Sequence, residues 1–166
     1  VVYEKNGRYP TPLFDERSNC QLGAQLDETG DLKQDRIDAT LVTITRFAAI
    51  IRAMDVSVCY PVATAAVRRA KNGEAFYIPA EEILGMAVDI LTQEDEANYV
   101  ARGLTLNIPD ADGLVADLGG GSIEIVSLKK GVIRHCTSFN FGHLSDVNES
   151  EITKALSSCL LYTSPS

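Results

Sequence analysis

Short apolar runs rich in β-branched residues alternate along this chain with stretches in which apolar residues recur every three or four positions. The apolar runs predict strands at residues 1–3, 13–14, 56–62 (a buried strand), 86–91, 114–118, 123–128 and 132–139. The helical spacing predicts helices at residues 31–51, 63–71, 74–84, 92–109 and 150–160. Strands that alternate with helices and then follow one another predict an α/β domain with a mixed sheet flanked by helices.

Signals at the ends of these elements sharpen the prediction. Asp31 and Gln34 are spaced as a capping box, with Asp31 as the N-cap. The helix that follows has an apolar face made of Ile37, Leu41, Ile44, Ala48 and Ile51. Gly85 is expected to end the helix at 74–84, and Thr92 is expected to be the N-cap of the helix that follows. Asn6-Gly7 is expected to form a turn. In the helix after Thr92, one face is made of Ala97, Val100, Ala101 and Leu104.

The chain is acidic, which narrows the functional classes open to it. Its 166 residues contain 15 Lys and Arg against 23 Asp and Glu, a formal net charge of −8. Nonspecific binding to nucleic acid needs a basic surface, and an anionic membrane surface would repel this chain. Because 45% of the residues are hydrophobic and no apolar run approaches the ~18 residues of a membrane span, we expect a soluble, cytoplasmic globular protein.

The four cysteines are far apart in the sequence, with no C-x-x-C pair and no histidine at the spacing of a metal site. They are Cys20, Cys59, Cys136 and Cys159. Each lies in or beside an apolar or strand-like stretch, so we expect reduced, mostly buried thiols rather than disulfides.

The strongest chemical signal is a glycine-rich link between two predicted strands. It reads Asp117-Leu118-Gly119-Gly120-Gly121-Ser122-Ile123-Glu124. Three successive glycines allow their N–H groups to converge on a phosphate oxygen, and Ser122 adds a hydroxyl. Asp117 is placed to hold Mg²⁺ or orient a water, and Glu124 to contribute a second carboxylate. Because a plain hairpin needs only about two turn residues, this link favours a binding site over a flexible turn.

Two further segments carry charge but are ambiguous when taken alone. Residues 63–73 pass from a strand into a helix, which brings Arg68, Arg69 and Lys71 near the sheet edge where α/β proteins bind ligands. These side chains fit a solvated helix face equally well. Residues 92–98 place three acids in a first helical turn, an arrangement that the helix dipole alone accounts for.

Taken in this order, the three segments resemble the exopolyphosphatase and guanosine pentaphosphate phosphohydrolase (Ppx/GppA) family. Residues 63–73 are similar to the family pattern Ala-Thr-x-Ala-x-Arg-x-Ala-x-Asn-Gly. Residues 92–98 are similar to the pattern Ser-Gly-x-Glu-Glu-Ala-Arg, and residues 117–124 are similar to the pattern Asp-Ile-Gly-Gly-Gly-Ser-x-Glu. The resemblance covers about residues 1–144. It implies an actin-like ATPase (ribonuclease H-like) fold and a hydrolase that uses Mg²⁺ to release the terminal phosphate of inorganic polyphosphate or guanosine pentaphosphate.

The resemblance also implies roles for individual residues. Glu96 matches the catalytic glutamate that positions or deprotonates the attacking water, and Arg68 matches the arginine that faces the phosphate chain. Asp117 and Glu124 match the acidic positions of the Mg²⁺ and water site. The second phosphate loop is matched by Gly119, Gly120, Gly121 and Ser122. This division suits phosphoryl hydrolysis, which needs an in-line water, Mg²⁺ and donors to the transferring oxygens.

The chain also departs from the family pattern. Thr92-Gln93 stands in place of Ser-Gly, Asp95 in place of Glu and Asn98 in place of Arg. Gly142 is kept, but His143 follows it where a small residue is commoner, and we interpret this histidine as a surface or packing residue.

Parts of the family sequence have no counterpart here. Neither its first strand with an Asp-x-Gly-Ser-Asn-Ser loop nor its second domain is matched. We therefore expect residues 1–144 to be an incomplete N-terminal domain and residues 145–166 to begin the next segment, with a tail from about residue 157 unlike the family. Such a fragment is expected to be inactive or nearly so, and the resemblance implies a homodimeric parent.

Two alternatives stay open. Kinases and chaperone ATPases of the same fold carry similar glycine loops, and a non-catalytic module that binds or senses phosphate chains would keep the loop without turnover. Glu96 and Arg68 in family register favour the hydrolase, whereas Asn98 leaves room for the sensing module. No residue separates polyphosphate from guanosine pentaphosphate as the substrate.

Overall fold

The computed structural model describes residues 1–4, 9–144, 149–150, 152–153 and 157. In chain order these form β1 (Val2–Glu4), β2 (Thr11–Phe14), α1 (Leu26–Thr29), α2 (Gln34–Ala53), β3 (Val62–Ala63), α3 (Ala65–Arg69), α4 (Glu74–Leu84), β4 (Asp89–Ile90), α5 (Gln93–Asn107), β5 (Gly113–Leu118), β6 (Ile123–Lys129) and β7 (Val132–Phe139). The predicted turn at Asn6-Gly7, Cys159 and most of the predicted helix at 150–160 lie outside the described residues.

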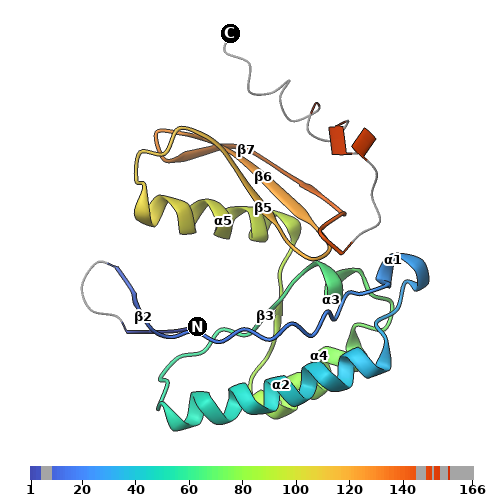
Figure 1. Ribbon diagram of the computed structural model, residues 1–166. Coiled ribbons are helices and arrows are strands. Elements are labelled where there is room, and N and C mark those ends of the chain that lie inside the picture. The colour runs from blue at the N-terminus through green and yellow to red at the C-terminus, as the bar shows by residue number, and fades with distance from the viewer. Residues whose placement is uncertain (5–8, 145–148, 151, 154–156, 158–166) are drawn as a thin grey trace.

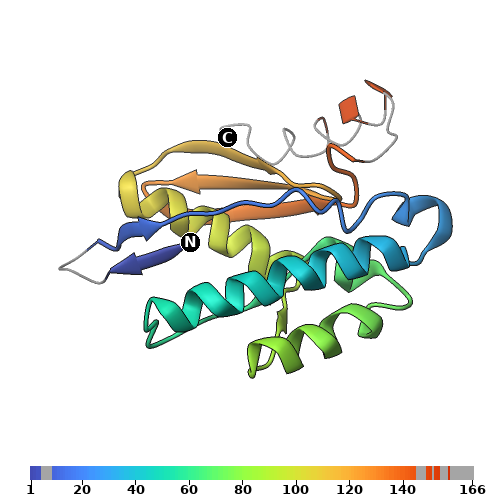
Figure 2. The same ribbon diagram turned by 60° about the horizontal axis from the view of Figure 1, so that its bottom comes forward.

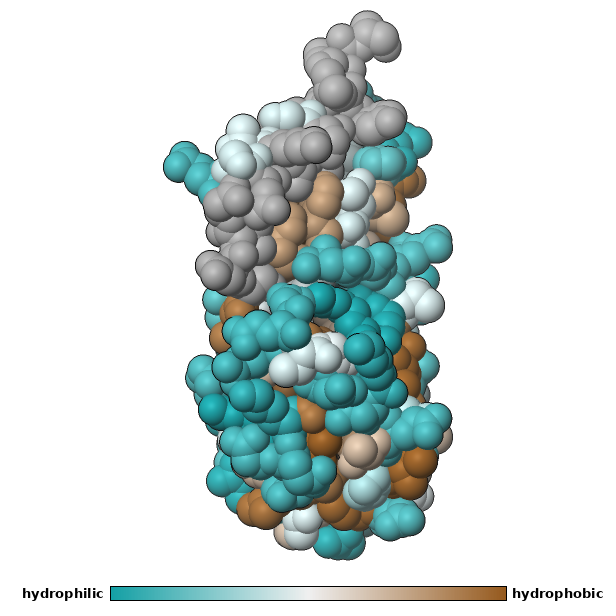
Figure 3. All heavy atoms as spheres, turned by 90° about the vertical axis from the view of Figure 1, so that its right-hand side faces the viewer, coloured by the Kyte–Doolittle hydropathy of each residue, from teal (hydrophilic) through white to brown (hydrophobic). Residues whose placement is uncertain are grey.

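Two packed units lie one above the other in Figure 1. The upper unit is the antiparallel sheet β5–β6–β7 with α5 across its lower face, and the lower unit contains α2 and α4, which pack side by side (Figures 1 and 2). The other strands pair as antiparallel β1–β2 and parallel β3–β4, so the described strands form three small sheets. The face that carries α1 is mostly hydrophilic, with apolar side chains in smaller patches (Figure 3).

The core of the lower unit joins α1, α2, α3, β3 and α4. Its buried residues are Leu26, Leu32, Ile37, Ala63, Val67, Phe76 and Ala80. The predicted apolar stripe on α2 contributes Ile37 to this cluster, and Leu41 and Ile44 pack against it. As predicted, α4 ends at Gly85, whose φ of 72° is a left-handed conformation that glycine adopts without strain.

The core of the upper unit lies between α5 and the sheet. Its buried residues are Ala97, Ala101, Ala111, Val126 and Leu128. Ala97 and Ala101 lie one helical turn apart, and their small side chains let α5 approach the sheet closely. The predicted cap of α5 is confirmed: the Thr92 hydroxyl accepts a hydrogen bond from Asp95 N–H, while the Asp95 carboxylate accepts one from Thr92 N–H, both at 3.1 Å.

The predicted cap of α2 was wrong. The helix begins at Gln34 with Lys33 as N-cap, and no side chain caps it. The reason is tertiary: Leu32 N–H donates to the Asn72 side-chain oxygen at 2.7 Å, and the Asn72 amide donates back to Leu32 O at 2.9 Å. This pair of bonds uses the Leu32 backbone to join two loops, so the helix starts only after it.

The buried strand predicted at residues 56–62 was also wrong in extent. Only Val62–Ala63 is a strand, paired with the two residues of β4, and Val58, Tyr60 and Val62 are exposed. Within the described part of the chain β4 is the one strand that pairs with this segment, which limits the ladder to two residues. The strand predicted at 86–91 is shortened to Asp89–Ile90 for the same reason.

Two expectations from composition concern the thiols and the membrane. Cys20, Cys59 and Cys136 are free, as expected, although they are half-buried rather than fully buried. Within the part of the chain that the structure describes, no helix combines the length and the hydropathy that crossing a bilayer requires.

Candidate active site at the glycine loop

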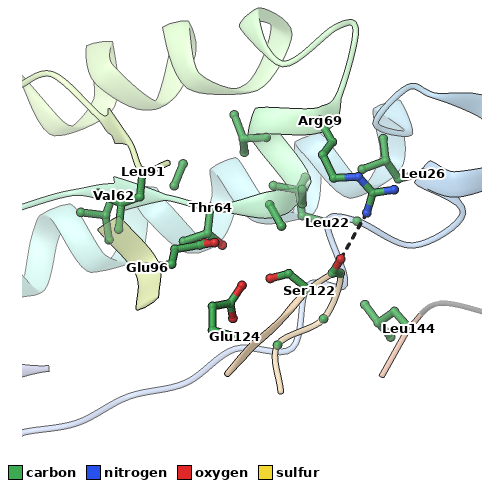
Figure 4. A pocket seen from close by; sticks show the side chains of 18 of the residues that line it. Leu22, Leu26, Val62, Thr64, Arg69, Leu91, Glu96, Ser122, Glu124 and Leu144 are labelled. Atoms are coloured by element: carbon green, nitrogen blue, oxygen red, sulfur yellow. Dashed lines mark hydrogen bonds between the residues drawn. The ribbon is translucent and has the colours of Figure 1, made fainter. Parts of the chain in front are cut away.

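A cavity of about 530 Å³ lies between the lower unit and the three-stranded sheet. Its walls come from α1, β3, α3, the first turns of α5 and the turn between β5 and β6, and Figure 4 shows side chains from these elements around it. The polar residues that line it include Asp27, Thr64, Arg69, Glu96, Asp117, Ser122 and Glu124, together with Gly119, Gly120 and Gly121. Of the residues predicted for the site, Arg68 is the one that does not line this cavity.

Asp117, Glu124 and Ser138 form a polar row across the sheet. Asp117 on β5 is paired with Glu124 on β6, which is paired in turn with Ser138 on β7. Directly opposed residues of antiparallel strands project to the same face, and the Ser138 hydroxyl donates a hydrogen bond to Glu124 Oε1 at 3.0 Å. Glu124 is buried, whereas Asp117 is exposed. Two carboxylates are therefore opposed at the cavity, an arrangement that like-charge repulsion disfavours unless a cation lies nearby.

The glycine loop between β5 and β6 is held by the chain that follows β7. His143 N–H donates to Gly119 O and Leu144 N–H to Gly120 O, both at 3.0 Å, and His143 Nδ1 lies 3.0 Å from the same Gly119 oxygen. Since a trans peptide directs its N–H opposite to its C=O, the N–H groups of Gly120 and Gly121 point away from this clasp.

Glu96 occupies the first turn of α5, where the Thr92 cap fixes the start of the helix. Its side chain is 10% exposed, and Arg68 donates to its Oε2 through both Nη1 and Nη2, at 3.1 and 3.2 Å. Arg68 Nη1 also donates to Leu91 O at 2.5 Å, just before α5. Arg68, which does not line the cavity, therefore fixes the carboxylate of Glu96, which does.

Arg69, the next residue, does line the cavity. Its Nη1 donates to Gly121 O at 3.2 Å, the bond drawn in Figure 4, and its Nη2 pairs with the Asp27 carboxylate on α1. Two arginines that are adjacent in the sequence thus bind different neighbours. Arg68 binds the buried Glu96, and Arg69 binds the glycine loop.

Comparison with known proteins decides the family. The sequence model described as the Ppx/GppA phosphatase family matches residues 1–149. The chain belongs to this family.

Solved structures related to this Ppx/GppA chain agree with its fold. The Ppx/GppA enzyme of Aquifex aeolicus is 30% identical, with a TM-score of 0.72, over 84% of this chain and 47% of that one. An exopolyphosphatase from Cytophaga hutchinsonii has a TM-score of 0.79 at 24% identity, over 92% of this chain and 52% of that one. The predicted actin-like α/β fold is confirmed, and the chain spans about half the length of the structures it matches.

Sequence reasoning missed part of this Ppx/GppA cavity. No sequence motif marks Asp27, and for Arg69 the sequence leaves two interpretations equally open, the ligand-binding edge of the sheet and a solvated helix face. The clasp by residues 142–144 was not foreseen either, although Gly142 was noted as a family position and His143 was interpreted as surface or packing. The match of Gly142 to the family pattern was the sequence signal for this clasp. The structure explains the glycine, because a Cβ at this position would lie 2.4 Å from Gly119 O and from the Gly120 carbonyl carbon.

The environment of Glu96 raises its pKa above the ordinary glutamate value. Burial is the largest cause, the Arg68 cation opposes it, and the nearby Glu124 carboxylate adds to it. A carboxylate with a raised pKa is a stronger base once it is ionised, which suits a group that takes a proton from water.

We expect this shift to appear in the pH dependence of the rate of the full-length protein. If Glu96 is the general base, as its match to the catalytic glutamate of the family implies, it works only when deprotonated, and kcat/KM should fall as the pH drops through its raised pKa. Arg68→Ala removes the cation that opposes the shift, and its acid limb should therefore lie at higher pH than that of the wild type. Both proteins are assayed with the same substrate, so a difference between their pH profiles comes from the enzyme and not from ionisation of the substrate.

The control for this profile is Arg102→Ala, which removes an exposed guanidinium from α5. It should leave the acid limb unchanged. An Arg68→Ala profile that coincides with the wild type would contradict the role of Arg68 beside Glu96.

Proposed function

We propose that this protein is a Mg²⁺-dependent phosphohydrolase that releases the terminal phosphate of inorganic polyphosphate or guanosine pentaphosphate. The observation that carries the proposal is the buried Glu96, held by Arg68 on one side and lining a cavity shared with the glycine loop on the other. Family membership supports phosphatase chemistry, and a similar solved structure is described as an exopolyphosphatase.

The charges around the cavity support a requirement for a divalent cation. Its described lining contains the four carboxylates of Asp27, Glu96, Asp117 and Glu124 against the single guanidinium of Arg69. A phosphate chain would be repelled by this excess of negative charge. A bound Mg²⁺ would offset it and would neutralise charge on the transferring oxygens.

The opposed pair Asp117 and Glu124 fits such an ion. Mg²⁺ is commonly bound by one or two carboxylates together with waters and substrate phosphates, rather than by a complete protein cage. Among the described residues no group of three or more His, Cys, Asp or Glu side chains is placed to hold a metal ion, so the proposed site rests on this pair alone. We therefore assign Asp117 and Glu124 to the Mg²⁺ site, with Ser138 orienting Glu124 through its hydrogen bond.

In the proposed reaction Glu96 takes a proton from the attacking water. The water oxygen forms a bond to the terminal phosphorus while the phosphoanhydride bond on the opposite side breaks, and the shortened chain leaves with its bridging oxygen. The glycine loop and the Ser122 hydroxyl offer hydrogen-bond donors to phosphate oxygens. Burial of Glu96 and Ser122 limits access of bulk water to the reacting groups.

The test uses the full-length protein, because this chain spans only about half of its structural relatives. Phosphate release is measured from long-chain polyphosphate, guanosine pentaphosphate and ATP, each with Mg²⁺. Release from either of the first two, well above ATP, supports the proposal and identifies the substrate. Preference for ATP favours an ATPase of the same fold, and binding of polyphosphate without release favours a sensing module.

Removing one proposed ligand should change the Mg²⁺ requirement. In Asp117→Asn we expect the Mg²⁺ concentration for half-maximal rate to rise by about tenfold or more, since even outer groups of a metal site affect affinity on that scale. Mg²⁺ titrations of the wild type and the variant measure the effect. Asp112→Asn, an exposed change just before β5, is the matched control. An unchanged Mg²⁺ requirement in Asp117→Asn would remove Asp117 from the site.

A further inference from the structure

Arg69 is the one lysine or arginine among the described residues that line the cavity. The family pattern leaves its position unspecified and places the phosphate-facing arginine at Arg68 instead. Arg68, however, donates hydrogen bonds to Glu96 and to Leu91 O, and it does not line the cavity. The positive charge available to an anionic ligand in this space therefore comes from Arg69.

The side chain of Arg69 is held beside the glycine loop. Its Nη1 bond to Gly121 O and its pairing with Asp27 fix the guanidinium between the loop and α1. The side chain remains 26% exposed, and a guanidinium has five N–H donors in a planar fork that suits phosphate oxygens. Further donors thus remain for a ligand that enters the cavity.

Figure 4 shows how Arg69 lies relative to the acidic groups. Glu96 and Glu124 lie on one side of Ser122, and Arg69 lies on the other. A phosphate chain whose terminal group reaches Glu96 would pass the glycine loop and continue toward Arg69.

We propose that Arg69 binds the phosphate chain of the substrate beyond its terminal phosphate, and that Asp27 holds the guanidinium when no substrate is bound. This inference rests on the proposed function and adds a specific binding residue to it. Asp27 competes with the substrate for Arg69 and also adds a negative charge to the cavity. The two members of this ion pair are therefore expected to affect substrate binding in opposite directions.

A purely structural ion pair would behave differently. If Arg69 and Asp27 only joined α1 to the glycine loop, removing either partner would break the same link. Both variants would then have similar effects on stability and on KM. The direction of the KM change in each variant separates the two cases.

The experiment measures kcat and KM for long-chain polyphosphate with full-length Arg69→Ala and Asp27→Asn. Loss of charge-assisted hydrogen bonds should raise the KM of Arg69→Ala about tenfold or more with little change in kcat. Asp27→Asn should lower KM or leave it unchanged, and Arg69→Lys should lie between Arg69→Ala and the wild type. Arg17→Ala, whose side chain is 90% exposed, is the control for loss of one positive charge. A rise in KM of similar size in both Arg69→Ala and Asp27→Asn, or an unchanged KM in Arg69→Ala, would overturn the proposal.

A binding measurement keeps this inference separable from the proposed function. Equilibrium binding of polyphosphate is compared between Glu96→Gln and Glu96→Gln/Arg69→Ala, so that no turnover is needed. Weaker binding in the double variant supports the role of Arg69 even if the wild type hydrolyses no polyphosphate. Equal binding in the two proteins overturns that role even if the wild type is an active phosphohydrolase.

Discussion

Glu96→Gln should reduce phosphate release by the full-length protein by ~10²-fold or more, the range expected for loss of a general base. A glutamine keeps the size of the side chain, and its oxygen can still accept the hydrogen bonds that Arg68 donates to Glu96. What it cannot do at neutral pH is take a proton from water. The loss should therefore appear in kcat, because the cavity proposed to bind the substrate is otherwise unchanged.

The matched control for this prediction is Glu94→Gln. Glu94 lies in the same first turn of α5, but it is exposed and does not line the cavity. The same chemical change two residues away should leave the rate close to that of the wild type. Equal activity in Glu96→Gln and the wild type would mean that another group accepts the proton, and equal loss in both variants would indicate a general effect on α5.

The acid–base behaviour of Glu96 also bears on stability. Its pKa is raised in the folded protein, mainly by burial, so the folded state retains a proton that the unfolded chain has already lost over the interval between the two values. The free energy of unfolding contributed by this group therefore falls as the pH rises through that interval. An ionised, buried glutamate is a cost to the fold, and the proposed role of Glu96 as a general base would explain why the protein bears this cost.

Helix boundaries were predictable where the signal was local. Thr92 and Asp95 cap α5 with atoms three residues apart, and Gly85 ends α4 through its own backbone conformation. The Asp31 cap failed because Leu32 is bonded to Asn72, forty residues away, and no local pattern reports such a bond. The strand at 56–62 failed for a related reason, since the length of a strand depends on what pairs with it.

The candidate site was predictable as a set of motifs but not as a geometry. Glu96 and the 117–124 motif were expected to act together, and they line one cavity. The sequence could not assign Arg68 and Arg69 to their neighbours, because adjacent helical residues project about 100° apart. Which of them faces the cavity depends on how α3 packs through its buried Ala65 and Val67.

Gly142→Ala should disrupt the glycine loop more than any other small change nearby. An added Cβ would lie 2.4 Å from Gly119 O, 2.4 Å from the Gly120 carbonyl carbon and 2.5 Å from Gly120 O. These are backbone atoms, so no flexible side chain can move aside. The clasp formed by His143 N–H and Leu144 N–H would have to separate from the loop.

Two measurements should register this displacement. The free energy of unfolding should fall by about 1–3 kcal/mol, as for other overpacked sites. Activity should fall by ~10²-fold, because displacing the loop by about 1 Å would misplace its proposed phosphate donors relative to Glu96. Urea unfolding and phosphate release, measured on the same preparations, would report the two effects separately.

Gly103→Ala is the control that makes this prediction specific. Gly103 lies exposed within α5, and a Cβ there meets nothing within 4 Å. The same substitution should therefore stabilise the protein by roughly 0.5–1 kcal/mol through helix propensity, with activity unchanged. If Gly142→Ala behaved like Gly103→Ala, the clasp would not hold the loop in solution. If Gly142→Ala lost activity while its stability was retained, the clasp would act on the position of the loop rather than on the fold, because the donors around the substrate phosphate would move without unfolding the core.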